Sequence, residues 1–233
     1  MNSFSIIIPV FNEQHNIPLL YDEIIKNNIH EKINHIIFVD DFSADLSVKN
    51  IKVLINKDKK VKLIQNNKNF GQSYSIYRGI NFCKDNTVIT IDADLQNNPK
   101  DILKLVEMYN NDKDIFLIGG LRLNRKDTFI KKITSRIANN IRQYILSDKC
   151  FDTGCALKVF DRDTFLKFPY FDGIHRFLPA LFKGYGKKTL FIPVDHRLRI
   201  HGFSKYGTFK RLFKGILDLY KVHNLIRNSK NND

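Results

Sequence analysis

The sequence of 233 residues contains only three cysteines, Cys83, Cys150 and Cys155, and they have no spacing typical of a zinc site. A small, odd number of cysteines disfavours a disulfide framework and favours reduced thiols in a cytosolic setting. The N-terminus has neither the basic segment nor the long apolar segment of a secretory signal. No stretch has the roughly 18 apolar residues that a membrane-spanning helix needs. We therefore expect a protein that is soluble or lies on a membrane without crossing it.

Glycine-rich phosphate loops are missing as well. Neither the pattern GxGxxG nor the pattern GxxxxGK followed by Ser or Thr occurs, which disfavours dehydrogenases and P-loop proteins. The composition is otherwise that of a globular chain, with 43% hydrophobic and 27% charged residues. A chain of this length and composition can bury a full core and is expected to form one domain.

A strong positive charge is the clearest feature of the composition. Lys and Arg number 38 against 24 Asp and Glu, so the formal net charge is +14. Such an excess attracts polyanions, and the candidates are nucleic acid, an anionic bilayer and phosphorylated substrates. A general role of this charge in solubility stays open as the alternative.

Short β-branched runs alternate with amphipathic stretches along the first half of the chain. Apolar strands separated by helices predict an α/β fold with a mostly parallel sheet that is covered on both faces. The predicted strands are 4–10, 34–39, 61–65, 87–91, 115–119 and 189–195. The predicted helices are 16–28, 45–55, 72–83, 99–109, 128–146, 175–185 and 208–227, with Asp45 as a cap and Pro99 in a first turn.

Five carboxylates follow predicted strands: Glu13 after the first, Asp40 and Asp41 after the second, and Asp92 and Asp94 after the fourth. Ligands of parallel sheets bind beyond the carboxyl ends of the strands. Carboxylates gathered there would repel one another and raise their pKa values. Mg²⁺ or Mn²⁺ would relieve this repulsion and leave positions open for diphosphate oxygens. A solvated turn for the D-x-D segment and helix capping for the Asp pair stay open as alternatives.

The second half of the chain, from about residue 121, is more basic. A compact unit at 151–163 and a basic loop at 196–207 follow the predicted helix at 128–146. The terminal helix interleaves apolar side chains with Lys and Arg, which suits a helix lying in a bilayer interface. Docking of this helix on the domain, with a solvated basic face, is the equal alternative.

Several motifs together carry a resemblance. The order of PVFNE at 9–13, VDDFSAD at 39–45, NFGQ at 69–72 and DADLQNNP at 92–99 resembles the family 2 glycosyltransferases, which have a GT-A nucleotide-sugar-binding fold. Motifs of the second half are similar to the dolichol-phosphate mannosyltransferase branch, which makes polyprenyl-phosphate sugars: GLRLNR at 120–125, Ser135, FDTGCALKVF at 151–160, HRFLPAL at 175–181 and R-x-x-G-x-S-K-Y at 199–206. One departure is Phe42, where the family more often has glycine. A bulky side chain takes a left-handed turn only at a cost, so this departure leaves the geometry of the loop open.

The resemblance implies a role for each matching residue. Nucleotide-sugar binding is implied for Pro9, Phe11, Glu13, Asp40, Asp41, Gln72, Asp92, Ala93, Asp94, Gln96 and Arg122, with Asp92, Asp94 and Gln96 holding the metal. Contact with the acceptor phosphate is implied for Arg122, Ser135, Arg199, Ser204 and Lys205. The implied catalytic set is Asp94, Asp152, Arg199 and Lys205.

The resemblance also implies an organisation and a reaction. A GT-A catalytic domain would occupy residues 1–207, with a nucleotide-sugar-binding half at 1–120 and an acceptor-binding half at 121–207, followed by a basic amphipathic helix and tail at 208–233. The protein would use Mg²⁺ or Mn²⁺ to transfer a hexose, with mannose from GDP-mannose favoured, to a polyprenyl phosphate with inversion. It would be cytoplasmic and peripheral on the cytoplasmic face of a membrane, where a membrane-anchoring subunit is a further conceivable partner.

The chemistry of the acceptor supports this branch. A lipid monophosphate is ionised at pH 7 and is itself a nucleophile, so it needs cations rather than the carboxylate base that a sugar hydroxyl requires. Asp152 stays open between assisting the reaction and pairing with Arg122 or Arg199. The alternatives are a UDP-sugar donor (UDP-glucose or UDP-N-acetylhexosamine), a saccharide acceptor and, more distantly, a basic nucleic-acid-binding protein. The acidic strand ends disfavour nucleic acid as a partner.

Overall fold

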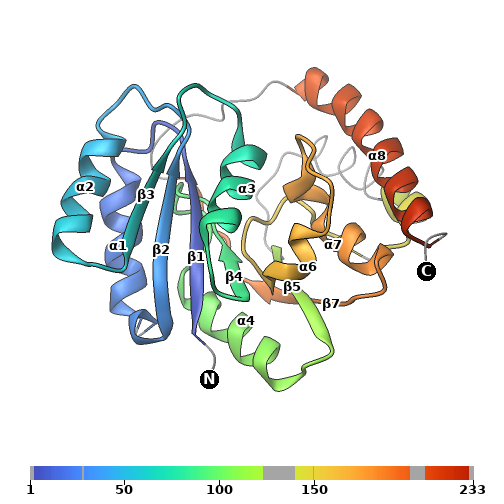
Figure 1. Cartoon of the computed structure of the whole chain (residues 1–233), viewed down its shortest axis with the longest axis horizontal. Helices are drawn as coiled ribbons and strands as arrows, with labels where there is room; N and C mark the ends of the chain where they lie inside the picture. Colours follow the sequence, from blue (N-terminus) through green and yellow to red (C-terminus); the bar gives the residue numbers. More distant parts are fainter. Residues whose placement is uncertain (1–2, 28, 123–139, 149, 200–207, 231–233) are drawn as a thin grey trace.

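The computed structural model describes residues 3–27, 29–122, 140–148, 150–199 and 208–230 of the chain. Seven strands form one sheet (Figure 1): β1 Phe4–Val10, β2 Ile33–Asp40, β3 Val61–Gln65, β4 Thr87–Thr90, β5 Ile115–Arg122, β6 Lys158–Asp161 and β7 Lys188–Val194. The helices are α1 Asn16–Lys26, the 3₁₀ helix η1 His30–Lys32, α2 Ser47–Lys57, α3 Gln72–Phe82, α4 Lys100–Asn111, α6 Arg162–Leu166, α7 Ile174–Gly184 and α8 Thr208–Lys230. Residues 140–146 are also helical.

The sheet is parallel except for one strand. Its order is β3-β2-β1-β4-β6-β5-β7, in which β6 runs antiparallel to both β4 and β5. The other neighbours pair in parallel. The carboxyl ends of β1, β2 and β4 are therefore adjacent at one edge, and the start of β6 lies at that same edge. We call this edge of the sheet the rim.

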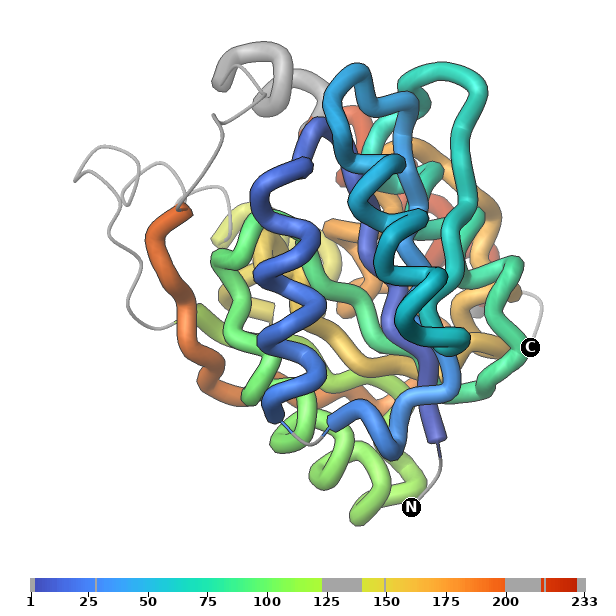
Figure 2. The backbone as a smooth tube through the Cα atoms, turned by 90° about the vertical axis from the view of Figure 1, so that its left-hand side faces the viewer, coloured from blue at the N-terminus to red at the C-terminus, as the bar shows by residue number. Residues whose placement is uncertain are grey.

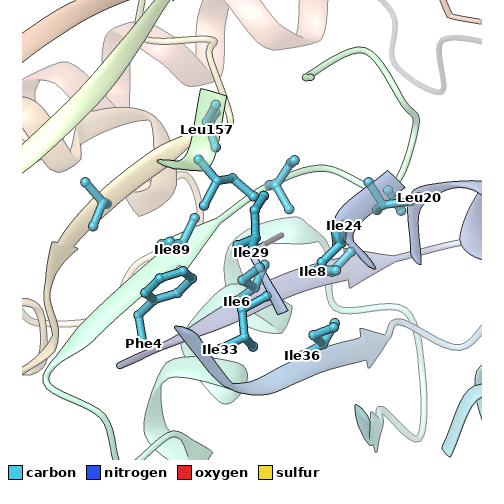
Figure 3. Close-up of a cluster of buried hydrophobic side chains, with 14 of the residues drawn as sticks. Phe4, Ile6, Ile8, Leu20, Ile24, Ile29, Ile33, Ile36, Ile89 and Leu157 are labelled. Atoms are coloured by element: carbon cyan, nitrogen blue, oxygen red, sulfur yellow. The ribbon is translucent and has the colours of Figure 1, made fainter. Parts of the chain in front are cut away.

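The core lies on both faces of the sheet because successive side chains of a strand point to opposite faces. Ile6 and Ile8 of β1 belong to one buried cluster with Leu20 and Ile24 of α1 (Figure 3), and residues of α2 and α4 complete it. Figure 2 shows α1 and α4 on this same side of the sheet. Ile7 belongs to a second cluster with residues of α3, α6 and α7. Coverage of both faces explains why the central strands are almost wholly apolar.

The α/β fold with a mostly parallel sheet is confirmed, and all six predicted strands are present. The compact unit at 151–163 was incompletely interpreted, because it contains the strand β6 and begins the helix α6. A strand of four residues is too short to show the alternation of apolar and polar residues that identifies a strand in a sequence. Two helix starts also differ. The residue at the cap of α2 is Leu46, although Asp45 Oδ1 does accept the backbone N–H of Ser47 at 2.9 Å, and Pro99 stands at the cap of α4 rather than in its first turn.

The described part of α8 docks on α7, beside which it runs in Figure 1. Val222 is fully buried in the second core cluster, and Asp218 Oδ2 lies 3.0 Å from Arg176 Nη2 of α7. On the other side of the helix, Leu217 and Tyr220 are 58% and 69% exposed. Of the helices in the described ranges, none is both long and apolar enough to cross a membrane.

Candidate active site

The rim gathers the predicted nucleotide-binding residues because three neighbouring parallel strands end there. Val10 and Asp40 are register partners, and the backbone N–H of Asp41 donates to the carbonyl of Val10 at 2.8 Å. Ile91 follows β4 and donates its N–H to the carbonyl of Ile7 at 3.3 Å, which carries the D-x-D segment alongside the end of β1. Parallel strands thus place residues from three distant parts of the sequence at one edge.

The two adjacent aspartates after β2 have different surroundings. Asp40 is 2% exposed, and its Oδ2 accepts the N–H of Ser43 at 3.2 Å. Its Oδ1 is buried and has no hydrogen-bond partner among the described residues. A buried carboxylate oxygen without a donor costs free energy, so a ligand that brings an N–H or O–H would be favoured there. Asp40 therefore suits the predicted contact with a nucleoside.

Both carboxylate oxygens of Asp41 accept hydrogen bonds from the loop before α3. Its Oδ1 accepts the N–H of Phe70 at 2.9 Å and the side-chain amide of Asn66 at 2.6 Å, and its Oδ2 accepts the N–H of Gly71 at 2.7 Å. Gly71 has φ +92°, a conformation that favours glycine, and it is the N-cap residue directly before α3. Asp41 thus positions the loop that delivers Gln72 to the site.

We expect Asp41→Ala to lower the free energy of unfolding by about 3 kcal/mol, because buried donors to a charged acceptor lose their partner. For a chain of this size, this loss corresponds to a fall in Tm of roughly 6–12 °C, which differential scanning fluorimetry measures. Asp114→Ala at an exposed carboxylate is the matched control. An unchanged Tm for Asp41→Ala would contradict the loop-holding role.

The D-x-D segment places two carboxylates side by side. Asp92 Oδ1 accepts the side-chain amide of Gln72 at 2.7 Å, and Asp94 is 6% exposed. Desolvation and the nearby charge of Asp94 raise the pKa of Asp92 to about 7, although Lys158, Arg122 and Arg199 act in the opposite direction. Burial and the neighbouring carboxylate thus disfavour the ionised form of Asp92 more than the three cations favour it.

A hard divalent cation fits this pair, since Mg²⁺ and Mn²⁺ prefer carboxylate oxygens and would offset the repulsion between Asp92 and Asp94. The described residues contain no group of three or more His, Cys, Asp and Glu suited to a metal. A cation held here would complete its coordination with oxygens of a bound diphosphate or of water. Gln96 lies next to the pair, where its N–H donates to Asp94 Oδ1 at 3.1 Å.

Arg122 and Asp152 form a buried pair at the rim. Arg122 Nε donates to Asp152 Oδ2 and Arg122 Nη2 to Asp152 Oδ1, each at 2.6 Å, and the two side chains are 13% and 9% exposed. A Cβ at Gly154 would lie 2.6 Å from Arg122 Nη2, so a larger residue there would displace the guanidinium from its present position. Of the two roles that the sequence left open for Asp152, the structure contains the pairing with Arg122.

Arg199 reaches Asp94 from the other end of the chain. The segment after β7 pairs with the segment after the D-x-D motif through a bridge of Asn97 with His196, and Arg197 donates its N–H to the carbonyl of Gln96 at 2.8 Å. Arg199 Nη2 then lies 2.5 Å from Asp94 Oδ2. A predicted acceptor-binding residue and a predicted metal ligand are therefore in direct contact.

Lys158 is a candidate that the sequence reasoning missed. It is the first residue of β6, is only 4% exposed, and donates from Nζ to the carbonyl of Cys155. Because β6 is antiparallel, its first residue lies at the rim beside the carboxyl end of β4. The lysine within the apolar run ALKVF could have indicated this position, since lysine is rarely buried unless it is paired.

The remaining predicted residues divide into two groups. Pro9, Phe11 and Glu13 lie at or just after the end of β1 and are half-buried, and Ala93 is buried within the D-x-D segment. Glu13 Oε2 accepts the side-chain amide of Asn16 at 2.6 Å. Ser135, Ser204 and Lys205 lie outside the described residues. The structure thus brings together the predicted donor-site residues with Arg122, Asp152 and Arg199.

Comparison with known proteins identifies a family. Residues 5–168 match the model of glycosyl transferase family 2. The chain is 32% identical over 222 residues to dodecaprenyl-phosphate galacturonate synthase of Rhizobium johnstonii, covering 94% of this chain and 65% of that protein. It is 33% identical over 212 residues to undecaprenyl-phosphate 4-deoxy-4-formamido-L-arabinose transferase of Edwardsiella ictaluri, covering 88% and 63%. The chain thus spans less than two thirds of the length of these two relatives.

Solved structures share the fold. Glucosyl-3-phosphoglycerate synthase of Mycobacterium tuberculosis in complex with uridine diphosphate superposes with a TM-score of 0.72 at 14% identity, covering 96% of this chain and 80% of that chain. The same enzyme with Mn²⁺, UDP-glucose and phosphoglyceric acid gives a TM-score of 0.69 at 15% identity, covering 96% and 80%. At this identity the likeness extends to the fold alone.

Proposed function

The chain belongs to glycosyl transferase family 2, and from this premise we propose that it transfers a sugar from a nucleoside diphosphate sugar to a polyprenyl phosphate. The observation that carries the proposal is the meeting of two kinds of groups at the rim. The carboxylate of Asp92 lies within the electrostatic reach of Lys158, Arg122 and Arg199, and Asp94 Oδ2 lies 2.5 Å from Arg199 Nη2. Such a site suits a reaction in which two phosphorylated molecules must be held together.

The donor would lie along the carboxyl ends of β1, β2 and β4. The unsatisfied Oδ1 of Asp40 would accept a hydrogen bond from the nucleoside. Asp92 and Asp94 would hold Mg²⁺ or Mn²⁺ against the diphosphate. When bound, such a cation neutralises the negative charge that develops on the leaving diphosphate.

The acceptor would be held by the cations of the second half. Arg122 and Arg199 are partly accessible at the rim, with exposed fractions of their side chains of 13% and 27%. A phosphate oxygen of the lipid would attack the anomeric carbon as the bond from this carbon to the diphosphate breaks. A single displacement of this kind inverts the anomeric centre. The lipid phosphate brings its own negative charge, so no proton must be removed from it.

A saccharide hydroxyl as the acceptor is less well supported. Such an acceptor needs a carboxylate base, and Asp152 was the plausible candidate near the acceptor. Both of its carboxylate oxygens accept hydrogen bonds from the guanidinium of Arg122. A carboxylate that is held in this way is a poor proton acceptor, because the neighbouring positive charge favours its ionised form.

The relatives broaden the set of sugars that we propose for the donor. The resemblance of the motifs favours mannose from GDP-mannose, whereas the relatives named above act with galacturonate and with 4-deoxy-4-formamido-L-arabinose. We therefore place uronic acid and formamidopentose donors on UDP beside GDP-mannose as the substrates to test. The halves 1–120 and 121–207 remain our proposed division into donor and acceptor binding, although one sheet runs through both.

The acceptor determines where the protein would work. A polyprenyl phosphate resides in a bilayer, so the protein would act at a membrane surface, with the net charge of +14 attracting it to anionic lipids. We further propose the cytoplasmic face as this surface.

A panel of nucleotide-sugars tests the function. The full chain is incubated with a short polyprenyl phosphate, Mg²⁺ or Mn²⁺, and each radiolabelled donor in turn: GDP-mannose, UDP-glucose, UDP-N-acetylglucosamine, UDP-galacturonate and a UDP-formamidopentose. We expect the label to enter the organic phase with one donor, and chelation by EDTA to abolish the transfer. Label that appears only in water-soluble saccharide, or in no product with any donor, would overturn the proposal.

A further inference from the structure

The turn after β2 contains a strained and exposed phenylalanine. Phe42 has φ +66°, in the left-handed region that non-glycine residues rarely adopt, and it is 59% exposed. The sequence left the geometry of this turn uncertain, and the structure shows that Phe42 adopts the costly conformation. Strained backbone of this kind persists where the surroundings over-determine it, and it concentrates at ligand sites.

The surrounding hydrogen bonds hold the turn in place. Ser43 donates its N–H to Asp40 Oδ2 at 3.2 Å, so this bond spans Phe42. Ser43 Oγ accepts the N–H of Asn12 at 2.9 Å, and Asn12 Oδ1 accepts the N–H of Ala44 at 2.8 Å. Asn12 also has a positive φ, at +54°. These bonds therefore link the loop after β1, which contains Asn12, to the turn that contains Phe42, and both residues have a positive φ.

Phe42 lies in the same turn as a buried oxygen that lacks a hydrogen-bond donor among the described residues. The buried Oδ1 of Asp40 without a partner belongs to the same turn, two residues earlier. A nucleobase offers both an N–H for such an oxygen and an apolar face for an aromatic ring. An exposed aromatic side chain gains free energy when it stacks on a base, and this gain does not depend on which base is present.

We infer that Phe42 is a nucleobase-contacting residue, which binds the base of the donor while Asp40 accepts its hydrogen bond. This inference rests on the proposed function and deepens it, because it assigns part of the donor affinity to a residue where glycine is more usual in the resembled family. The strain in the turn is the cost of presenting the ring at the rim.

The inference makes an unusual prediction, since one substitution should change stability and affinity in opposite directions. Phe42→Gly relieves the left-handed strain, so Tm should rise by roughly 2–4 °C. The dissociation constants of UDP and GDP, whichever the chain binds, should nevertheless rise by about tenfold in titration calorimetry with Mg²⁺. Phe42→Leu keeps the strain and much of the bulk but removes the aromatic face, and it should weaken binding by a similar factor.

Two controls separate the base contact from other effects. Phe82→Ala removes an equally exposed phenylalanine from the far end of α3, where it is 55% exposed, and should leave nucleotide affinity unchanged. Inorganic diphosphate with Mg²⁺ has no base, so wild type and Phe42→Gly should bind it equally. Unchanged nucleotide affinity in Phe42→Gly, or an equal loss for diphosphate, would overturn the inference while leaving the proposed function intact. A wild-type chain that binds neither nucleotide would overturn both.

Discussion

Replacing Asp94 by Asn is expected to lower sugar transfer by at least about 100-fold while the protein stays folded. The charge of Asp94 is needed to hold a divalent cation beside Asp92, and a cation at a leaving diphosphate contributes several kcal/mol to the transition state. Transfer is measured with the donor that the panel identifies, and Mn²⁺ affinity by electron paramagnetic resonance. Both should fall together, because the amide retains the size of the side chain and loses only its charge.

Asp163→Asn is the control for this experiment. Asp163 has a side chain that is 59% exposed and pairs with Arg162 at 3.0 Å, far from the rim, so transfer and Mn²⁺ affinity should not change. Sugar transfer at the wild-type rate in Asp94→Asn would contradict the assignment of Asp94 as a metal ligand. Lost transfer with normal Mn²⁺ affinity would instead assign Asp94 to its contact with Arg199.

Arg122→Met should produce the largest loss of stability among the substitutions at the rim. It leaves the carboxylate of Asp152 buried without its counter-ion, which costs about 3–5 kcal/mol. For a chain of this size, Tm should fall by roughly 6–20 °C, as differential scanning fluorimetry would record. Lys188→Met breaks the exposed pair of Lys188 with Asp112, at 2.7 Å, and should leave Tm unchanged within error.

A double variant separates the two roles of Arg122. In Arg122→Met with Asp152→Leu, both buried charges are replaced by apolar groups, and most of the stability should return. Transfer should remain at least about 100-fold below wild type, because the guanidinium that we assign to the phosphates is still missing. Recovery of transfer together with stability would show that the pair serves only the fold.

The positions of the carboxylates in the site could be predicted from the sequence. Asp40, Asp41, Asp92 and Asp94 each follow an apolar strand, and parallel strands end at the same edge whatever their order. Local pattern was therefore enough to place them together. It was not enough to distinguish Asp40 from Asp41, because only the folded loop at 66–71 shows that the hydrogen bonds of Asp41 go to that loop.

The positions of the cationic side chains in the site could not be predicted from local sequence patterns. The strand β6 has four residues and runs against its neighbours, so its first residue, Lys158, was not expected at the rim. The same reversal brings Asp152 to Arg122, and the pairing of the segments around Asn97 and His196 brings Arg199 to Asp94. These contacts join residues 30 to 105 positions apart, and only the tertiary structure decides them.

By itself, then, the sequence determined the family, the parallel sheet and the line of carboxylates, since apolar periodicity and strand-end residues are local properties of the chain. The tertiary structure decided which of those carboxylates has an unsatisfied oxygen, which cations lie beside them, and that Phe42 accepts a strained backbone. The physical reason is that burial, pairing and strain depend on neighbours distant in sequence, which a local pattern does not specify.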